Sequence, residues 1–246
     1  MMLKRVLKAE KMIKMRHSPV WLAFLLIPII PAFMGTFNYL NNLGMLENQW
    51  YSLWTQHTLF ACYFFLPVLI GIYASYLLRL EHTNHNWNAV MTTPVPISRL
   101  FLAKLIMGWL MVILTQIWIG LLFIISGLLA GLSGPIPPEL PVWLLFGALG
   151  GMVVCALQLC LSLVIRSFAV PVGIALMGGV AGLALLSKGY GLYFPYALIT
   201  LGMRANDPAA PMLVGEAAFL IACAVFTAGL CLFAITWLKR RDVVTG

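Results

Sequence analysis

The feature that most constrains the fold of this chain is a series of six long apolar runs. Each run approaches or exceeds the length of about 20 residues that an α-helix needs to cross the hydrocarbon core of a bilayer. Only 9% of the 246 residues are charged, while 62% are hydrophobic. We therefore expect an all-α polytopic membrane protein with six transmembrane helices, over about 20–40, 58–78, 104–130, 142–165, 168–187 and 212–238.

These runs leave no segment for a folded soluble domain, so residues 1–246 are expected to form a single transmembrane domain. The five cysteines all fall inside apolar runs, which is typical of small buried residues and not of a disulfide framework. The net charge of +8 does not indicate a nucleic-acid partner, because the basic residues follow the membrane topology.

The distribution of basic residues predicts the orientation. If both termini are cytoplasmic, 13 of the 15 Lys and Arg residues lie on the inner side, and only Lys188 and Arg204 lie outside. This agrees with the excess of Lys and Arg in cytoplasmic loops of membrane proteins. Lys104 is expected to be anchored at the inner interface, close to the start of the third span.

Residues 1–17 have an amphipathic pattern. One helical face can be shared by the apolar residues Leu3, Val6, Leu7, Met12 and Ile13. The other faces carry the basic residues Lys4, Arg5, Lys8 and Lys11. We expect an N-terminal interfacial helix on the inner leaflet. The alternative is a basic flank without regular structure. Ser18 can cap the first span, with Pro19 in its first turn.

Two segments on the outer side have distinctive compositions. Residues 41–57 are expected to form a loop that carries Trp50, Tyr51 and Trp54 at the membrane–water boundary. Residues 188–211, between spans five and six, are too apolar for a free loop and too rich in Gly and Pro for a span. They predict a short re-entrant or interfacial segment.

Three polar residues within or near the spans are candidates for the transport pathway or for interhelical hydrogen bonds. Gln116 and Gln158 lie near the centres of their runs, where amide groups must find partners. Hydrogen bonding between helices is the interpretation that we favour for both. Glu216 lies early in the last span and can either meet a cationic substrate or extend to the interface.

The sequence contains no strong motif for nucleotide hydrolysis, serine proteolysis or metal binding. The phosphate-binding pattern G-x-x-x-x-G-K-[ST] is absent, so nucleotide hydrolysis by that route is excluded for this chain. Ser133 lies in a GLSG sequence that matches intramembrane serine proteases, but no histidine follows it in a later span. Glu81, His82 and His85 form an incomplete metal-ligand pattern, and we expect no metal site.

The polar stretch 79–99 is the most unusual segment between two spans. Trp87, Val90 and Met91 have helical spacing and form one apolar stripe. Pro94 ends this short helix, and Ser98 can cap the third span. The pattern indicates either a helix that docks onto a cytoplasmic partner or a solvated connector whose stripe rests on lipid.

The sequence also resembles a known family. An acidic residue after the second span, a short helix, and then T-x-P and P-I-S-R followed by a Lys are similar to permeases of type-2 ABC exporters. Here these residues are Glu81, Thr92/Thr93-Pro94, Pro96–Arg99 and Lys104. The terminal WLKRRDV, from Trp237 to Val243, resembles the usual ending of that family.

The resemblance implies that residues 79–99 form a coupling helix in a groove of a separate ATP-binding subunit, which holds the ATP and Mg²⁺, so that this chain needs no cofactor. It also implies a second permease chain, identical or paralogous, and a bacterial cytoplasmic membrane with both termini inside. The expected coupling residues are Glu81, His82, His85, Trp87, Val90, Met91, Pro94 and Arg99.

Within the family, the short outer loops look most similar to permeases of lantibiotic immunity and bacitracin resistance, which remove antimicrobial peptides from the membrane. Export of a lipid or drug is the alternative substrate. From another class, the chain could be an intramembrane enzyme or an assembly factor without transport activity.

Overall fold

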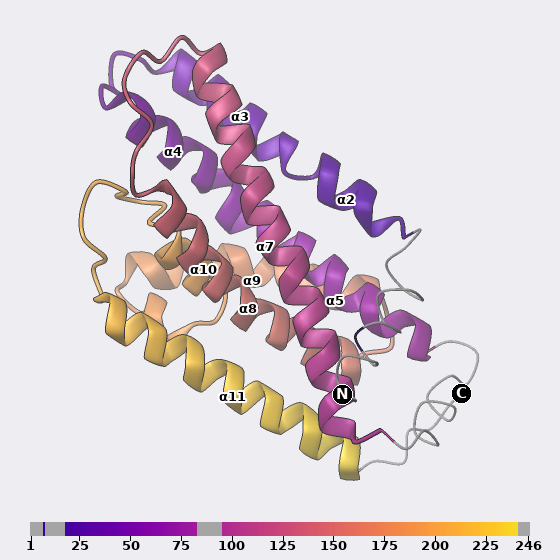
Figure 1. Cartoon of the computed structure of the whole chain (residues 1–246). Coiled ribbons are helices and arrows are strands. Elements are labelled where there is room, and N and C mark those ends of the chain that lie inside the picture. The colour runs from indigo at the N-terminus through magenta and orange to yellow at the C-terminus, as the bar shows by residue number, and fades with distance from the viewer. Residues whose placement is uncertain (1–6, 8–17, 83–94, 241–246) are drawn as a thin grey trace.

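The computed structural model describes Leu7, residues 18–82 and residues 95–240. Every regular element among these residues is helical, and they contain six segments that are long and apolar enough to cross a membrane. The expected all-α polytopic fold is confirmed (Figure 1). The predicted interfacial helix over residues 1–17 lies outside the described residues, apart from Leu7.

The six spans have well-defined bounds. The first comprises α2 (Val20–Leu26) and α3 (Ile29–Asn41), and the second comprises α4 (Gln49–Phe60), the π-helical turn η2 (Ala61–Phe65) and α5 (Leu66–His82). The other four are α7 (Ile97–Leu129), α8 (Leu140–Val164), α9 (Ala169–Ser187) and α11 (Glu216–Arg240).

The first span begins as predicted and is then interrupted. Ser18 Oγ accepts a hydrogen bond of 3.1 Å from the Val20 amide, which satisfies one of the unpaired donors at the helix start. The break between α2 and α3 falls at Ile27 and Pro28. Pro28 has no N–H to donate, so the regular hydrogen-bond ladder is interrupted there.

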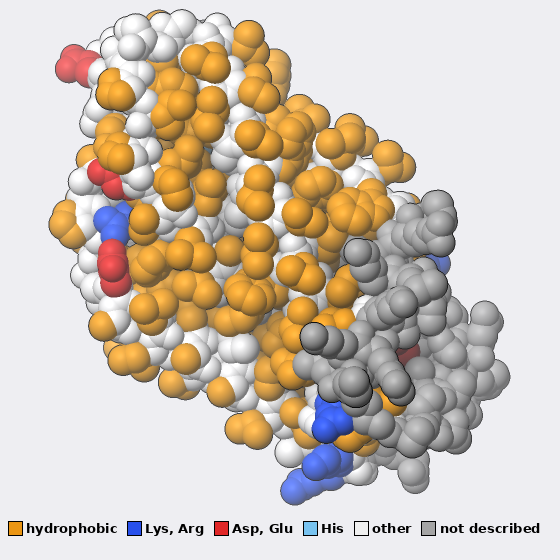
Figure 2. Space-filling view, viewed as in Figure 1, with side chains coloured by type: hydrophobic (Ala, Val, Ile, Leu, Met, Phe, Trp, Pro, Cys, Tyr) orange, Lys and Arg blue, Asp and Glu red, His pale blue; other side chains and the backbone are white. Residues whose placement is uncertain are grey.

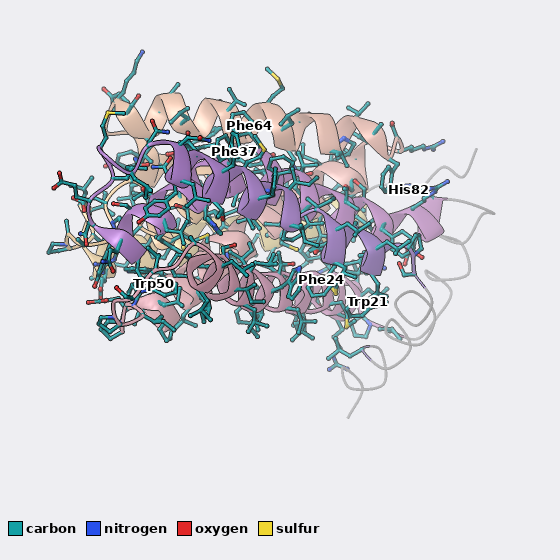
Figure 3. The ribbon with its side chains drawn as sticks, turned by 90° about the horizontal axis from the view of Figure 1, so that it is seen from above. Trp21, Phe24, Phe37, Trp50, Phe64 and His82 are labelled. Carbon is teal, nitrogen blue, oxygen red and sulfur yellow. The ribbon has the colours of Figure 1, made fainter. Side chains whose placement is uncertain are left out.

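The second span is longer than predicted, and the predicted loop over residues 41–57 is wrong in its second half. The helix begins at Gln49 and runs to His82, instead of beginning near residue 58 (Figure 3). Trp50 and Trp54, expected at the membrane–water boundary, are buried. Their indole rings pack edge-on against Phe123 of α7, which explains why a segment of mixed polarity continues the helix.

The third span also starts earlier than predicted, at Ile97 instead of near residue 104. Pro96 occupies the capping position, and no side chain caps this helix end, so the expected role of Ser98 as a cap is wrong. As a result, the predicted coupling segment 79–99 includes the last turn of α5 and the first turn of α7.

The two ends of the bundle differ in charge. One end, which we call the basic end, contains the start of α2, the end of α5, the start of α7 and the end of α11 (Figure 1). Lys and Arg side chains are visible at this end, whereas the opposite end shows more acidic than basic side chains (Figure 2). Between the two ends the visible surface is dominated by apolar side chains, as expected for a surface in contact with lipid.

The core forms around the second and fourth spans, which are the most buried of the six. Helix α8 packs against α5, α7, α10 and α11, so it contacts elements on several sides of the bundle. By contrast, α11 is the least buried span and lies at the edge of the bundle (Figure 1).

The segment between spans five and six was predicted to be re-entrant or interfacial, and we call it the re-entrant segment. It contains the 3₁₀ turn η3 (Gly191–Tyr193) and the short helix α10 (Ala197–Gly202), whose residues are all buried. Close backbone approach explains how α10 fits against α8: a Cβ on Gly150 would lie 2.5 Å from the Leu198 carbonyl oxygen, and one on Gly202 would lie 2.4 Å from that of Phe146. The part of the segment around α10 is therefore packed inside the protein, whereas Tyr190 and Tyr193 before it are exposed.

Candidate functional site

The predicted coupling residues fall into two groups. Glu81, His82 and Arg99 are in the part of the chain that the structure describes, whereas five others lie outside the described residues: His85, Trp87, Val90, Met91 and Pro94. Glu81 and His82 belong to the last turn of α5, and Arg99 is an exposed residue in the first turn of α7. The described part of the site is therefore the pair of helix ends on either side of residues 83–94.

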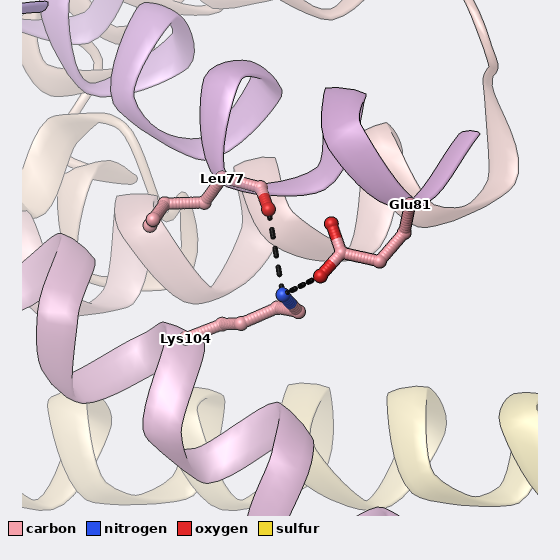
Figure 4. A network of polar contacts seen from close by, with 3 residues as sticks. All are labelled: Leu77, Glu81 and Lys104. Atoms are coloured by element: carbon pink, nitrogen blue, oxygen red, sulfur yellow. Dashed lines mark hydrogen bonds and ion pairs between the residues drawn. The ribbon is translucent and has the colours of Figure 1, made fainter. Parts of the chain in front are cut away.

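A buried ion pair joins these two helix ends. The Lys104 ammonium group, two turns into α7, donates a short hydrogen bond to Oε1 of Glu81 in the last turn of α5 (Figure 4). Both side chains are only 4% exposed. Removing one partner of a buried ion pair typically costs much more free energy than removing one partner of a surface salt bridge.

Lys104 also contacts the main chain near the end of α5. Its Nζ lies 3.4 Å from the carbonyl oxygen of Leu77, one turn before Glu81 (Figure 4). Carbonyl groups at a helix C-terminus carry partial negative charge, which a carboxylate such as Glu81 reinforces unfavourably. The ammonium group of Lys104 offsets both charges and thereby holds the end of α5 in a fixed register against α7.

A second contact joins the same turn of α5 to α8. Nε2 of His82 lies 2.8 Å from the Ser162 carbonyl oxygen. Since a carbonyl oxygen only accepts, His82 Nε2 is the donor. Ser162 lies in the last turn of α8, where carbonyl groups lack partners within the helix. About two turns earlier in α5, the hydroxyl group of Ser75 is hydrogen-bonded to that of the same Ser162 at 3.1 Å.

A third contact involves the connection between α8 and α9. The Arg79 guanidinium carbon lies 5.8 Å from the centre of the Phe168 ring, within the range of a cation–π interaction. We use the name basic-end clamp for the three contacts Glu81–Lys104, His82–Ser162 and Arg79–Phe168. The clamp ties the last turn of α5 to α7, to α8 and to the start of the fifth span.

Sequence reasoning expected Lys104 to be anchored at the inner interface, but it did not anticipate that Lys104 is buried within the protein and paired with Glu81. A signal was present in the sequence: Lys104 lies within the apolar stretch LFLAKLIMGW. A charge among apolar residues requires a partner of opposite sign. The sequence indicated that Glu81 follows the second span. It could not indicate that Glu81 pairs with Lys104, because that requires knowing which helices are adjacent.

The alternative chemical sites find no support among the described residues. The described residues contain no group of three His, Cys, Asp or Glu side chains that could hold a metal ion. His57, the one histidine expected on the outer side, is buried and bonded to Thr36 Oγ1 at 2.9 Å. The GLSG turn has a structural role, since the Gly134 carbonyl accepts a hydrogen bond of 2.8 Å from Trp50 Nε1.

The two glutamines that the sequence singled out, Gln116 and Gln158, both reach the re-entrant segment. Gln158 Nε2 in α8 donates a hydrogen bond of 2.7 Å to the hydroxyl of Tyr196, immediately before α10. Gln116 Nε2 in α7 lies 3.5 Å from the sulfur of Met203, immediately after α10. Both glutamines are buried. The structure thus places them in contacts between a span and the re-entrant segment.

Glu216 lies at the opposite end and has a partner that was not anticipated. Its Oε1 accepts a hydrogen bond of 2.8 Å from Arg204, which also donates one of 3.0 Å to the Ala210 carbonyl. The carboxylate side chain remains 56% exposed. Arg204 also lines a pocket of about 130 Å³, whose other lining residues are apolar except for Thr200, Asn206 and Asp207.

Comparison with known proteins identifies the family. The sequence profile described as ABC-2 family transporter protein matches residues 6–182, which is more than half of the chain. No curated protein matched the chain. The matched region includes the basic-end clamp and the first four spans, together with most of the fifth. The chain therefore belongs to the ABC-2 family of transporter permeases, whose members work with an ABC ATP-binding subunit.

Proposed function

We propose that this chain is one of two permease subunits of an ATP-driven exporter that removes an amphiphilic antimicrobial peptide, such as a lantibiotic or bacitracin, from the bacterial cytoplasmic membrane. Family membership supports a transporter permease. The observation that carries the proposal further is the buried Glu81–Lys104 pair, because it joins the two helices on either side of residues 83–94.

In this proposal the basic end faces the cytoplasm, and both termini lie on that side. The stretch 79–99 docks in a groove of the ATP-binding subunit, with Trp87, Val90 and Met91 as apolar anchors. ATP and Mg²⁺ are bound by the partner, and this chain contributes no cofactor site. His85, Pro94 and Arg99 complete the contact.

The substrate class is supported by surface properties. Large apolar side chains on the outer faces of α3, α9 and α11 are exposed, so an amphiphile in the membrane can approach them. At the opposite end the described charged residues are four acidic side chains and only two basic ones, with the acidic ones being Glu47, Glu139, Asp207 and Glu216. An excess of acidic groups favours cationic amphiphiles over anionic ones.

The test is protection of growing cells. Cells that produce this chain with its ATP-binding partner should tolerate higher concentrations of a lantibiotic or bacitracin than cells lacking it. The variant W87D/M91D should lose this protection, whereas W87F/M91L, which keeps both apolar anchors, should retain it. Full protection by W87D/M91D would contradict the docking role.

Export of a lipid or drug is the second candidate within the same class. If neither peptide is tolerated better but a lipid or drug stimulates ATP hydrolysis by the purified complex, the substrate is reassigned and the permease role stands. A chain that acts only in assembly would leave ATP hydrolysis insensitive to every amphiphile.

A further inference from the structure

We infer that the basic-end clamp transmits the nucleotide-driven movement of the ATP-binding subunit to the re-entrant segment at the opposite end, and that Glu81 and Lys104 are the positioning residues of this transmission. The inference rests on the proposed function. It concerns how a displacement near residues 83–94 reaches the other side of the membrane.

The first step is the joining of α5 to α7. Both helices are covalently connected to residues 83–94, one on each side. The Glu81–Lys104 pair and the bond from Lys104 to the Leu77 carbonyl fix their relative register at the point nearest to that segment. Because hydrogen bonds to charged groups are directional, the two ends move together, whereas apolar contacts alone permit sliding.

The second step is the joining of α5 to α8. The bond from His82 to the Ser162 carbonyl and the Ser75–Ser162 bond attach the same part of α5 to the end of α8. Helix α8 is 25 residues long and regular, so a shift at its last turn displaces its whole length.

The third step leads from α8 to the re-entrant segment. At Gly150 the backbone of α8 lies so close to the Leu198 carbonyl that no side chain fits between them. Such direct backbone contact leaves no flexible side chain to absorb a displacement. Gln158 adds a hydrogen bond to Tyr196, and Arg204 then links the end of the segment to Glu216 at the start of α11.

If the pair transmits movement, replacing it by apolar residues should abolish transmission even where the protein remains stable. Replacing a buried ion pair by apolar residues of similar volume often preserves or raises stability. The double variant E81M/K104M should therefore fold and assemble. It should nonetheless lose transmission, because methionine side chains do not fix the register between α5 and α7.

The experiment measures movement at the opposite end, so it does not depend on the substrate. Spin labels carried on unnatural amino acids replace Leu129 and Leu213, which are 83% and 91% exposed at that end. The distance between them is measured in the complete complex in vesicles, without nucleotide and after trapping with ATP and vanadate. The wild-type distance distribution should shift on trapping.

The expected result is that E81M/K104M, measured in the assembled complex, loses the shift, and that the charge-swapped variant E81K/K104E regains it. The matched control is Y73F/T115V. It removes a buried hydrogen bond of 2.8 Å between α5 and α7 that lies deeper in the bundle. This control should retain the shift.

Retention of the full shift by E81M/K104M would overturn the inference, as would its equal loss in Y73F/T115V or the absence of any shift in the wild type. Failure of the proposed function has a different signature, because then no ATP-binding subunit accompanies the wild-type chain.

Discussion

The Trp54 indole N–H donates a hydrogen bond of 2.9 Å to the main-chain carbonyl oxygen of Met203. These residues are 149 positions apart, and both are fully buried. The same methionine receives sulfur contacts from Cys62 in η2 and from Gln116 in α7. The end of the re-entrant segment is therefore held by two different spans.

The hydrogen bond of Trp54 can be separated from the packing of its ring by comparison with Trp143. Both tryptophans are fully buried and their rings stack, but Trp143 Nε1 has no acceptor among the described residues. Replacement by Phe removes a similar volume at each site. W54F should therefore be less stable than W143F by about 1 kcal/mol, measured as the free energy of unfolding in SDS–detergent titrations. Equal losses would show that the Trp54 bond contributes nothing net.

The Gln158–Tyr196 bond should behave as a coupled pair. Either Q158L or Y196F leaves a buried polar atom without its partner, at a cost of about 1 kcal/mol. The double variant Q158L/Y196F removes both groups and should cost less than the sum of the two single changes. Unfolding titrations of the four proteins give the coupling energy. Strict additivity would contradict the bond.

Because α8 and α10 approach closely at Gly150, adding one methyl group there should lower the stability of the protein strongly. G150A places a Cβ against the Leu198 carbonyl and should destabilise the protein by about 1–3 kcal/mol because the helices must separate. Gly173 in α9 is the matched control, since a Cβ there meets no atom within 4 Å. G173A should be neutral or stabilising by about 0.5–1 kcal/mol. Thermal unfolding in detergent compares the two, and equal effects would contradict the contact.

The two ion pairs of the described chain should differ in their contribution to stability. E81Q removes the carboxylate that accepts the hydrogen bond of the buried Lys104 ammonium group and should cost about 3–5 kcal/mol. E216Q affects a pair with an exposed carboxylate and should cost about 0–1 kcal/mol. The yield and unfolding temperature of the purified variants measure the contrast. A stable E81Q protein would show that the Lys104 site is accessible to water.

The spans could be predicted from the sequence because an apolar run of sufficient length has only one way to satisfy its backbone in lipid. The re-entrant segment was predicted for a similar reason, since Gly and Pro exclude a full span while its apolar side chains exclude an open loop. Span starts were less predictable. Trp50 and Trp54 stand among polar residues, and only their contacts with Phe123 and Trp143 show that the helix continues through them.

The site was predicted only in part, because its contacts join residues that are distant in the sequence. Glu81 was singled out, but its partner Lys104 lies 23 residues away and on another helix. Gln116 and Gln158 were expected to contact another helix, but the sequence did not indicate that both contact residues flanking α10. Periodicity shows which face of a helix is apolar, but not which neighbour that face meets.

The most direct test of the whole account is gentle purification of the chain from its native membranes, followed by quantification of the proteins that accompany it. The account predicts an ABC ATP-binding subunit in an amount equal to that of permease chains, and ATP hydrolysis in the same fraction. Purification in several mild detergents with no nucleotide-binding partner in any of them would contradict it.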